Sequence, residues 1–221
     1  MQTVFEKTRA DVMMQGNTPV LTYTINYPYF TTTCNPHACW NINCYYEIQA
    51  DSSERNCRTE LFPQAAQNGM YADYKQFPFR SYEFLSNYEI TYNKNCMVSL
   101  FTEDYSYMGG AHGNTIRQSQ TWDFQSGNQL KLNDFFSCKD SFTEYIFKEI
   151  NRQIIERLKE SPSSYFDDYP VLLRGNFNVN GFYLKPDGIV IYYQQYDIAP
   201  YVTGIPEFFI PFEPCFHESP R

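Results

Sequence analysis

The chain has 221 residues, enough for one large domain or two small ones with a core that needs no metal or disulfide staples. Its formal net charge is -8, carried by charges of both signs along the chain, which argues against a nucleic-acid partner and favours a cationic one. The 20 Tyr and 19 Phe favour half-buried strands.

The start of the chain shows no secretory signal, because no basic stretch precedes an apolar run of about 7–15 residues. No other stretch approaches the roughly 20 apolar residues of a membrane-spanning helix. We therefore expect no membrane segment in this chain and, by default, a cytoplasmic location. If the chain is a piece of a longer, anchored protein, the expected location is the cell surface.

Cysteines bear on the redox compartment, and the chain has seven: Cys34, Cys39, Cys44, Cys57, Cys96, Cys138 and Cys215. The count is odd and the spacing irregular, so we expect mainly reduced thiols, in keeping with the cytoplasm. Three of them lie with His37 in "CNPHACWNINC". Because this C-x4-C-x4-C spacing has no second ligand pair downstream, we expect no metal and no cofactor.

The N-terminal part is expected to hold one strand and one helix. Apolar and polar residues alternate over 20–30, the period of a half-buried strand. A loosely helical apolar spacing without glycine follows from Pro36 to about Ala66, which predicts one long or broken helix. Trp40 in this helix and Trp122 further along lie in apolar-periodic segments and are expected in the core.

Two hairpins are predicted in the middle of the chain. The first spans about 88–101 and turns at Asn93-Lys94-Asn95. The second spans about 116–132 and turns at Ser126-Gly127-Asn128. Together they indicate an antiparallel meander.

A long amphipathic helix is predicted over 141–159, where apolar residues recur every fourth position. Ser141 and Glu144 match a capping box. Charged pairs at i,i+4 are expected on the solvated face, Glu144 with Lys148 and Arg152 with Glu156.

The C-terminal part is expected to add a further hairpin, 182–184 with 189–193, around a Pro-Asp-Gly turn, and a last strand at about 207–212. The predicted fold class is α+β: an antiparallel sheet of hairpins packed against one long amphipathic helix, with a smaller N-terminal strand-helix part.

The segment "YMGGAHG", 107–113, is the first candidate site. Gly109 and Gly110 permit positive φ, so the structural interpretation is a tight turn or bulge between strands. The functional interpretation is a binding loop. His112 acts as a general base only if a carboxylate such as Glu103, Asp123 or Asp197 and a substrate lie beside it.

The segment "YDIAPY", 196–201, is the second candidate site. In the structural interpretation Asp197 bonds to nearby backbone N–H groups and the aromatic rings pack at a strand end. If this turn lies beside the first loop, then Tyr107, His112, Tyr196, Asp197 and Tyr201 line one cleft suited to a sugar or a cationic protein loop. The common nucleotide, metalloprotease and hydrolase motifs are absent from the sequence.

Two strings in this sequence resemble the signatures of a domain of unknown function. One runs from "YMGGAHG" through "TWDF" to "LKLNDFF", and the other is "YYQQYDIAPY" followed by Gly204. That domain occurs in the lysozyme-binding anti-sigma factor RsiV and beside the catalytic domain of the peptidoglycan deacetylase PdaC. The segment from Thr22 to Asn87 resembles the partner domain that usually precedes it.

The resemblance implies a PdaC-like N-terminal domain over 1–87, packed tightly against an RsiV-like C-terminal domain over 88–221. It also implies a non-enzymatic, sensor-like binding role, with a basic protein such as lysozyme or a wall-derived glycan as partner. The alternative is a hydrolase-like enzyme of cell-wall polymers with His112 as base. The expected ligand-binding residues are Tyr107, Gly109, Gly110, His112, Tyr196, Asp197 and Tyr201, and no catalytic residue is assigned.

Overall fold

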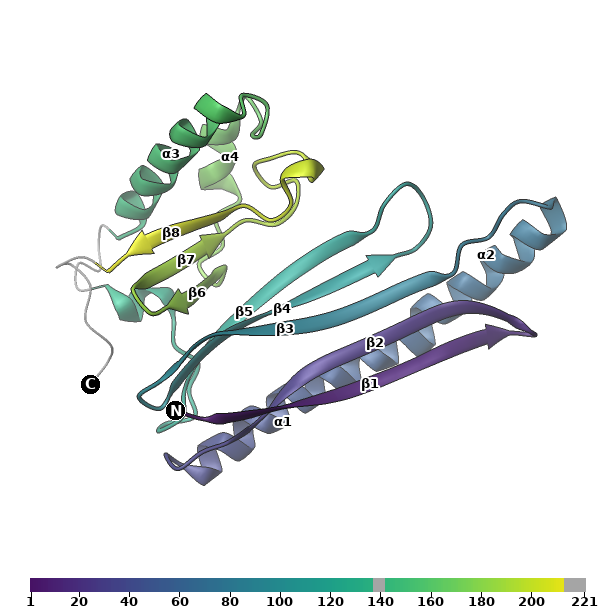
Figure 1. Ribbon diagram of the computed structural model, residues 1–221, viewed down its shortest axis with the longest axis horizontal. Coiled ribbons are helices and arrows are strands. Elements are labelled where there is room, and N and C mark those ends of the chain that lie inside the picture. Colours follow the sequence, from purple (N-terminus) through teal and green to yellow (C-terminus); the bar gives the residue numbers. More distant parts are fainter. Residues whose placement is uncertain (137–141, 213–221) are drawn as a thin grey trace. The chain divides into compact units, whose positions relative to one another are not determined.

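The computed structural model describes residues 1–136 and 142–212 (Figure 1). In this part the strands form a five-stranded sheet, ordered β1-β2-β3-β4-β5, and a three-stranded sheet, ordered β6-β7-β8. With the helices that join them, they confirm the predicted α+β class.

Two compact units divide the chain, and each is described by itself. The first holds 1–89, 102–116 and 124–127, and the second holds 90–101, 117–123 and the described residues from 128 onward. Each unit is built from several separate segments of the chain, so no single residue divides the two units. The predicted domain border between residues 87 and 88 stays a prediction.

A long β-hairpin opens the first unit. β1 (Thr3–Gln15) pairs antiparallel with β2 (Thr18–Thr31) across a turn in which Gly16 has φ 61°. The predicted strand at 20–30 is confirmed, and its apolar side chains alternate into the core. β1 was not predicted, because it lies at the edge of the sheet and its side chains are mostly exposed or half-buried, which leaves little apolar alternation.

The helix that begins at Pro36 is longer than predicted. It comprises α1 (Pro36–Asn56), a π-helical turn η1 (Cys57–Leu61) and α2 (Phe62–Lys75), and it ends where Gln76 takes a left-handed φ of 56°. Figure 1 shows α1 and α2 running along β1 and β2. Because this helix leads to β3 (Tyr82–Lys94), which pairs parallel with β2, it is the crossover that a parallel pair requires.

The start of α1 explains one wrong prediction. The Asn35 side chain accepts hydrogen bonds from the His37 and Ala38 N–H groups and thereby caps the helix. The buried face of α1 then carries Ala38, Cys39, Ile42, Tyr46 and Ala50. Trp40 falls off this face and is 63% exposed, so its predicted place in the core is wrong, whereas Trp122 is buried as predicted.

Both central hairpin predictions need correction. β3 is followed by β4 (Met97–Tyr107), but the turn lies at Asn95 and Cys96, both with positive φ, and not at 93–95. The strand expected from Ile116 is present as β5 (Asn114–Asp123). Its predicted return strand is wrong: one bridge joins Trp122 to Gln129, and a 3-10 helix, η2 (Leu132–Phe135), follows, since Leu132 turns inward to the core.

The predicted amphipathic helix is confirmed as α3 (Phe142–Glu160), with Ile146, Ile150 and Ile154 fully buried. The proposed cap Ser141 lies outside the described residues. The predicted i,i+4 pairs are not the closest ion pairs of this helix, although Arg152, after Lys159, helps to lower the pKa of Glu156. Arg152 and Lys159 pair three residues back, with Glu149 and Glu156, while Glu144 pairs with Arg174 of α4 (Tyr169–Gly175). Exposed ion pairs are weak, so the partner of each charged side chain depends on which opposite charge lies within its reach.

The three-stranded sheet confirms the C-terminal predictions. β6 (Phe182–Lys185) and β7 (Gly188–Tyr192) pair around Pro186 and Asp187, and β8 (Glu207–Pro211) pairs with β7. Figure 1 shows α3 beside β8.

Two side chains of α3 cover the outer edge of β8. Gln153 donates a hydrogen bond to the Phe209 carbonyl at 2.7 Å, and Arg157 donates one to the Glu207 carbonyl at 2.7 Å. Four residues of helix rise about 6 Å, close to the roughly 6.6 Å between alternate residues of a strand. The i,i+4 spacing of these donors therefore matches the outward carbonyls of an edge strand and satisfies them.

Candidate functional site

The first candidate loop, residues 108–113, joins β4 to β5 within the first unit. Gly109 and Gly110 both have φ of 91°, and a Cβ at either position would meet nothing within 4 Å. Glycine is needed there for backbone conformation and not for space. The positive φ of both glycines and the connection of two strands agree with the structural interpretation, whereas a binding role of this loop stays a prediction.

Tyr107 stabilises the conformation of this loop. Its ring is buried, its hydroxyl donates a hydrogen bond to the Gly110 carbonyl at 3.1 Å, and the Arg80 guanidinium lies 4.5 Å from the ring centroid. At Gly113 a Cβ would overlap the Tyr105 ring. Through this hydrogen bond Tyr107 positions the loop. Because its ring is buried, little of its surface is left for a ligand.

His112 extends from the loop into solvent. Its Nδ1 lies 2.9 Å from the Gly113 carbonyl oxygen, which can only accept, so Nδ1 carries the proton of the neutral ring. The ring is therefore oriented in part by the backbone next to it.

The second candidate loop follows β7 in the second unit and is anchored on several sides. The Asp197 carboxylate accepts the Gln194 N–H at 2.7 Å, as its structural interpretation expected. The Asn176 side chain donates to the Asp197 carbonyl at 2.6 Å, and Ile198 and Ala199 are buried. These contacts make the loop a rigid platform.

Two tyrosines stand on this platform. Tyr196 is 51% exposed, and its ring lies 5.8 Å from that of half-buried Tyr201, at an interplanar angle of 33°. Tyr196 has φ of 67°, a left-handed conformation that costs a non-glycine residue about 1–3 kcal/mol. The folded loop thus keeps Tyr196 in a strained conformation in which its exposed ring packs against Tyr201.

Asp197 makes this loop sensitive to pH. Burial raises the pKa of its carboxyl group, and the Gln194 N–H opposes that shift only in part. A raised pKa means that the folded state holds this proton more tightly than the unfolded chain does, so the contribution of Asp197 to stability grows as the pH falls through the folded pKa.

We therefore expect Asp197→Asn, which keeps an acceptor for the Gln194 N–H, to be at least as stable as the wild type at pH 7. The stability difference between the two proteins should shift in favour of the wild type as the pH falls. Urea unfolding of both proteins between about pH 7 and pH 4 measures this. A difference that stays constant across this range would show that burial does not control the carboxyl.

Arg117 supports the start of the same loop and was not predicted. The Gln194 side chain bonds to the Arg117 backbone on both sides, accepting its N–H at 3.0 Å and donating to its carbonyl at 2.6 Å. The Arg117 side chain, 8% exposed, lies over the rings of Phe101 and Tyr192 and forms an ion pair with Glu207. No sequence pattern marks this arginine, because its partners come from distant strands.

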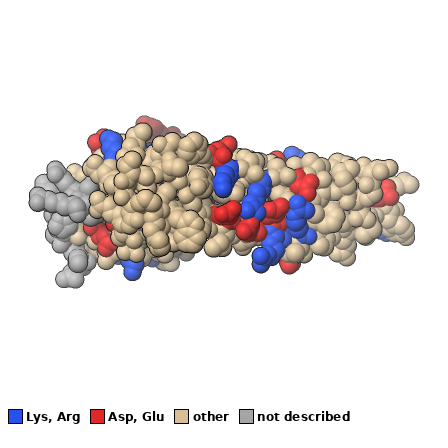
Figure 2. Space-filling model, turned by 90° about the horizontal axis from the view of Figure 1, so that it is seen from below, with Lys and Arg blue, Asp and Glu red and all other residues tan. Residues whose placement is uncertain are grey.

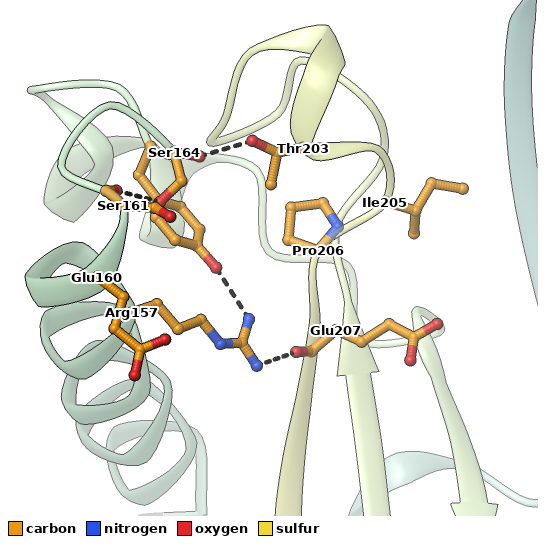
Figure 3. Close-up of a pocket in the computed structure, with 9 residues that line it drawn as sticks. Arg157, Glu160, Ser161, Ser164, Thr203, Ile205, Pro206 and Glu207 are labelled. Carbon is orange, nitrogen blue, oxygen red and sulfur yellow. Dashed lines mark hydrogen bonds between the residues drawn. The ribbon is translucent and has the colours of Figure 1, made fainter.

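A groove beside this loop was also missed. It encloses about 530 Å³ between the end of α3 and the chain that leads into β8 (Figure 3). Its lining residues are Arg157, Glu160, Ser161, Ser164, Tyr165, Thr203, Ile205, Pro206 and Glu207. They are ordinary polar and apolar residues with no motif spacing, so only the tertiary structure reveals the groove.

The predicted site residues thus fall into two groups. Tyr107, Gly109, Gly110 and His112 belong to the first loop and unit, and the others, Tyr196, Asp197 and Tyr201, to the second. That both groups line one cleft stays a prediction. Their roles as ligand-binding residues also stay predictions.

The cysteines depart in part from expectation. Cys39, Cys44 and Cys57 are free thiols, as predicted, and burial raises the pKa of Cys39 and, to about 12, that of Cys57. Cys34 and Cys96 are each disulfide-bonded, so the prediction of reduced thiols is wrong for these two. Disulfides are rare in the cytoplasm, so these two cysteines do not support the expected cytoplasmic location. Residues 1–136 and 142–212 contain no group of three His, Cys, Asp or Glu able to hold a metal.

None of the described helices combines the length and apolar character needed to cross a membrane.

Comparison with known proteins places two family segments on this chain. The family described as "Deacetylase PdaC" matches residues 14–115, and the family "Protein of unknown function (DUF3298)" matches residues 133–213. The peptidoglycan-N-acetylmuramic acid deacetylase PdaC of Bacillus subtilis is 25% identical over 216 residues. That alignment covers 92% of this chain but only 42% of the deacetylase.

Two solved structures share the fold. A DUF3298 family member from Bacteroides fragilis superposes with a TM-score of 0.65 at 19% identity, and a DUF3298 family protein from Pseudomonas aeruginosa with 0.57 at 16%. Each alignment covers 96% of this chain and 90% of the other chain. The chain therefore carries a PdaC-type segment followed by a DUF3298 segment, as the expected domain pair implied. The "YMGGAHG" string, which was expected in the C-terminal domain, lies within the PdaC match, and "YDIAPY" lies within the DUF3298 match.

Proposed function

We propose that this chain is a non-catalytic recognition module that binds a basic protein outside the cytoplasm, with the Tyr196–Tyr201 pair as its principal anchor. The observation that carries the proposal is the strained backbone of Tyr196 on a loop that hydrogen bonds and buried residues hold rigid. Strain that persists at an exposed aromatic residue is characteristic of functional sites.

Aromatic anchors suit such a role. Tyrosine offers a large contact area and a hydroxyl while it loses little conformational entropy on binding, because it has two side-chain torsions. A loop that already has its bound conformation avoids the cost of ordering. The exposed tyrosine pair therefore supports binding better than a mobile loop of the same sequence would.

Surface charge supports a basic partner but not its specificity. The net charge of -8 attracts a cation over a distance. Figure 2 shows acidic and basic side chains intermixed on one face, and in the first unit Arg9 and Arg58 are paired with Asp11, Asp51 and Glu54. Because paired carboxylates contribute little, specificity is expected to come from the aromatic anchors.

The name of one relative points to the cell wall. The Bacillus subtilis protein is by its name a peptidoglycan deacetylase, and this chain spans 42% of its length. We infer that the shared part recognises a ligand at the cell wall. Lysozyme, a basic protein that acts on this wall, is the first partner to test, in line with the resemblance to the lysozyme-binding anti-sigma factor.

Titration calorimetry against lysozyme at low and moderate salt tests the proposal. We expect Tyr196→Ala and Tyr201→Ala each to weaken binding by about 2 kcal/mol, roughly 30-fold, as is typical of aromatic anchors. His112→Ala reports separately on the first loop. Added salt should weaken binding, because it screens the long-range attraction.

Tyr74→Ala is the matched control, since Tyr74 on α2 is 78% exposed and belongs to neither loop. It should bind like the wild type. A wild type that does not bind lysozyme at either salt concentration excludes this partner. Binding that survives both loop substitutions unchanged excludes the Tyr196–Tyr201 pair as the anchor.

A further inference from the structure

We infer that the groove between the end of α3 and the segment before β8 is a separate binding site for a neutral saccharide. The inference does not depend on the proposed protein partner, because it rests on the lining of the groove and not on the tyrosine pair. With about 530 Å³, the groove falls within the range of small-molecule sites.

Arg157 supplies fixed hydrogen-bond donors. Figure 3 shows its side chain crossing the groove, where it donates to the Tyr165 hydroxyl at 2.9 Å and to the Glu207 carbonyl at 2.7 Å. Its guanidinium also lies 4.7 Å from the Phe208 ring centroid. A guanidinium has five N–H groups, and the described residues accept from two of them. The arginine is thus held in one place with donors to spare.

The hydroxyl groups around the groove supply acceptors. The Ser164 hydroxyl donates a hydrogen bond to the Ser161 carbonyl at 2.8 Å, and the Thr203 hydroxyl donates one to the Ser164 carbonyl at 2.8 Å. A hydroxyl whose O–H group is bonded to the backbone can still accept hydrogen bonds from a ligand through its lone pairs. The groove therefore offers donors from Arg157 and acceptors from the two hydroxyl groups, as the alternating groups of a sugar require.

The charges of the lining favour a neutral ligand. Arg157 and Glu160 carry opposite charges, and Glu207 is paired with the buried Arg117. An anionic ligand would meet Glu160, and a cationic one would meet Arg157, so neither sign is favoured. Pro206 adds an apolar side, against which the C–H face of a pyranose ring can pack. A neutral saccharide satisfies all of these features together.

The test is a titration of the isotope-labelled protein, followed by amide chemical shifts, with three neutral sugars: diacetylchitobiose, cellobiose and maltose. We expect at least one sugar to give saturable shifts centred on Ser161, Ser164 and Thr203. Arg157→Gln and the isosteric Thr203→Val should each weaken this binding, the former by about tenfold or more, because it removes a charged donor.

Gln153→Ala is the matched control, because Gln153 covers the neighbouring carbonyl of β8 from the same helix but does not line the groove. This variant should bind the sugar normally. It shows whether loss of a hydrogen bond to the edge of β8 by itself weakens sugar binding. Thr203→Val leaves the hydrogen bond from Arg157 to the Glu207 carbonyl intact. It therefore tests the groove even if Arg157→Gln folds poorly.

Three results would overturn the inference: no localised shift with any of the sugars, unchanged binding by Thr203→Val and by a folded Arg157→Gln, or stronger shifts at the same residues with glucuronate or with lysine methyl ester. The lysozyme calorimetry is independent of these results, so either proposal can fail alone.

Discussion

Ile150→Ala is expected to lower the free energy of unfolding by about 4 kcal/mol, near the upper part of the range for buried isoleucine truncations. Ile150 lies in the middle of α3, is 0% exposed, and contributes to the core between this helix and the three-stranded sheet. The alanine would lose apolar contacts and leave a cavity that the close-packed neighbours fill only in part. Urea unfolding followed by circular dichroism measures the loss.

Ile155→Ala is its matched control, with the same change in the same helix. Ile155 is 45% exposed, so we expect its truncation to stay within about 0.5 kcal/mol of the wild type. If both variants lost the same stability, burial would not explain the effect, and the packing of α3 described above would be incorrect.

The second large effect is expected from Gly188→Ala, with a loss of about 3 kcal/mol, the upper end for overpacking. Gly188 begins β7 and lies opposite Pro211 of β8. A Cβ there would overlap the Ile210 carbonyl oxygen and come within 2.6 Å of the Phe209 ring. The ring could rotate away, but the carbonyl belongs to the neighbouring strand, so β7 and β8 would have to separate.

Gly175→Ala is the control for this substitution. Gly175 ends α4, and a Cβ there would meet nothing within 4 Å. Because alanine is also the better helix former, no loss of stability is expected. Thermal unfolding of both variants distinguishes them by several degrees, since about 1 kcal/mol shifts the midpoint by roughly 2–4 °C at this chain length. Equal midpoints would contradict the close approach at Gly188.

The elements that could be predicted are those with a strong local pattern. The prediction of a helix over 141–159 agrees with the described α3, Phe142–Glu160, because its apolar residues recur with the helical period and bury one face. β6 and β7 were predicted from the Pro-Asp-Gly turn between two apolar runs. In both cases the residues that determine the element lie within it.

The elements that were missed depend on partners elsewhere. β1 carries little apolar alternation and is a strand because β2 supplies its hydrogen bonds. Trp40 lies in a helix as predicted, yet the buried face of that helix is set by its contact with β2. The return strand expected after β5 is replaced by η2, because Leu132 and Phe135 pack into the core of the second unit.

The same division holds for the candidate sites. The sequence alone determined that two loops carry glycines, a histidine and tyrosines in two signature strings, because such strings are contiguous. Only the tertiary structure decided that Tyr107 is buried beneath its loop, that exposed Tyr196 packs at a tilt against half-buried Tyr201, and that Arg157 crosses a groove toward β8. Side-chain periodicity is a local property of the chain, whereas exposure, strain and the lining of a groove depend on which distant segments come together.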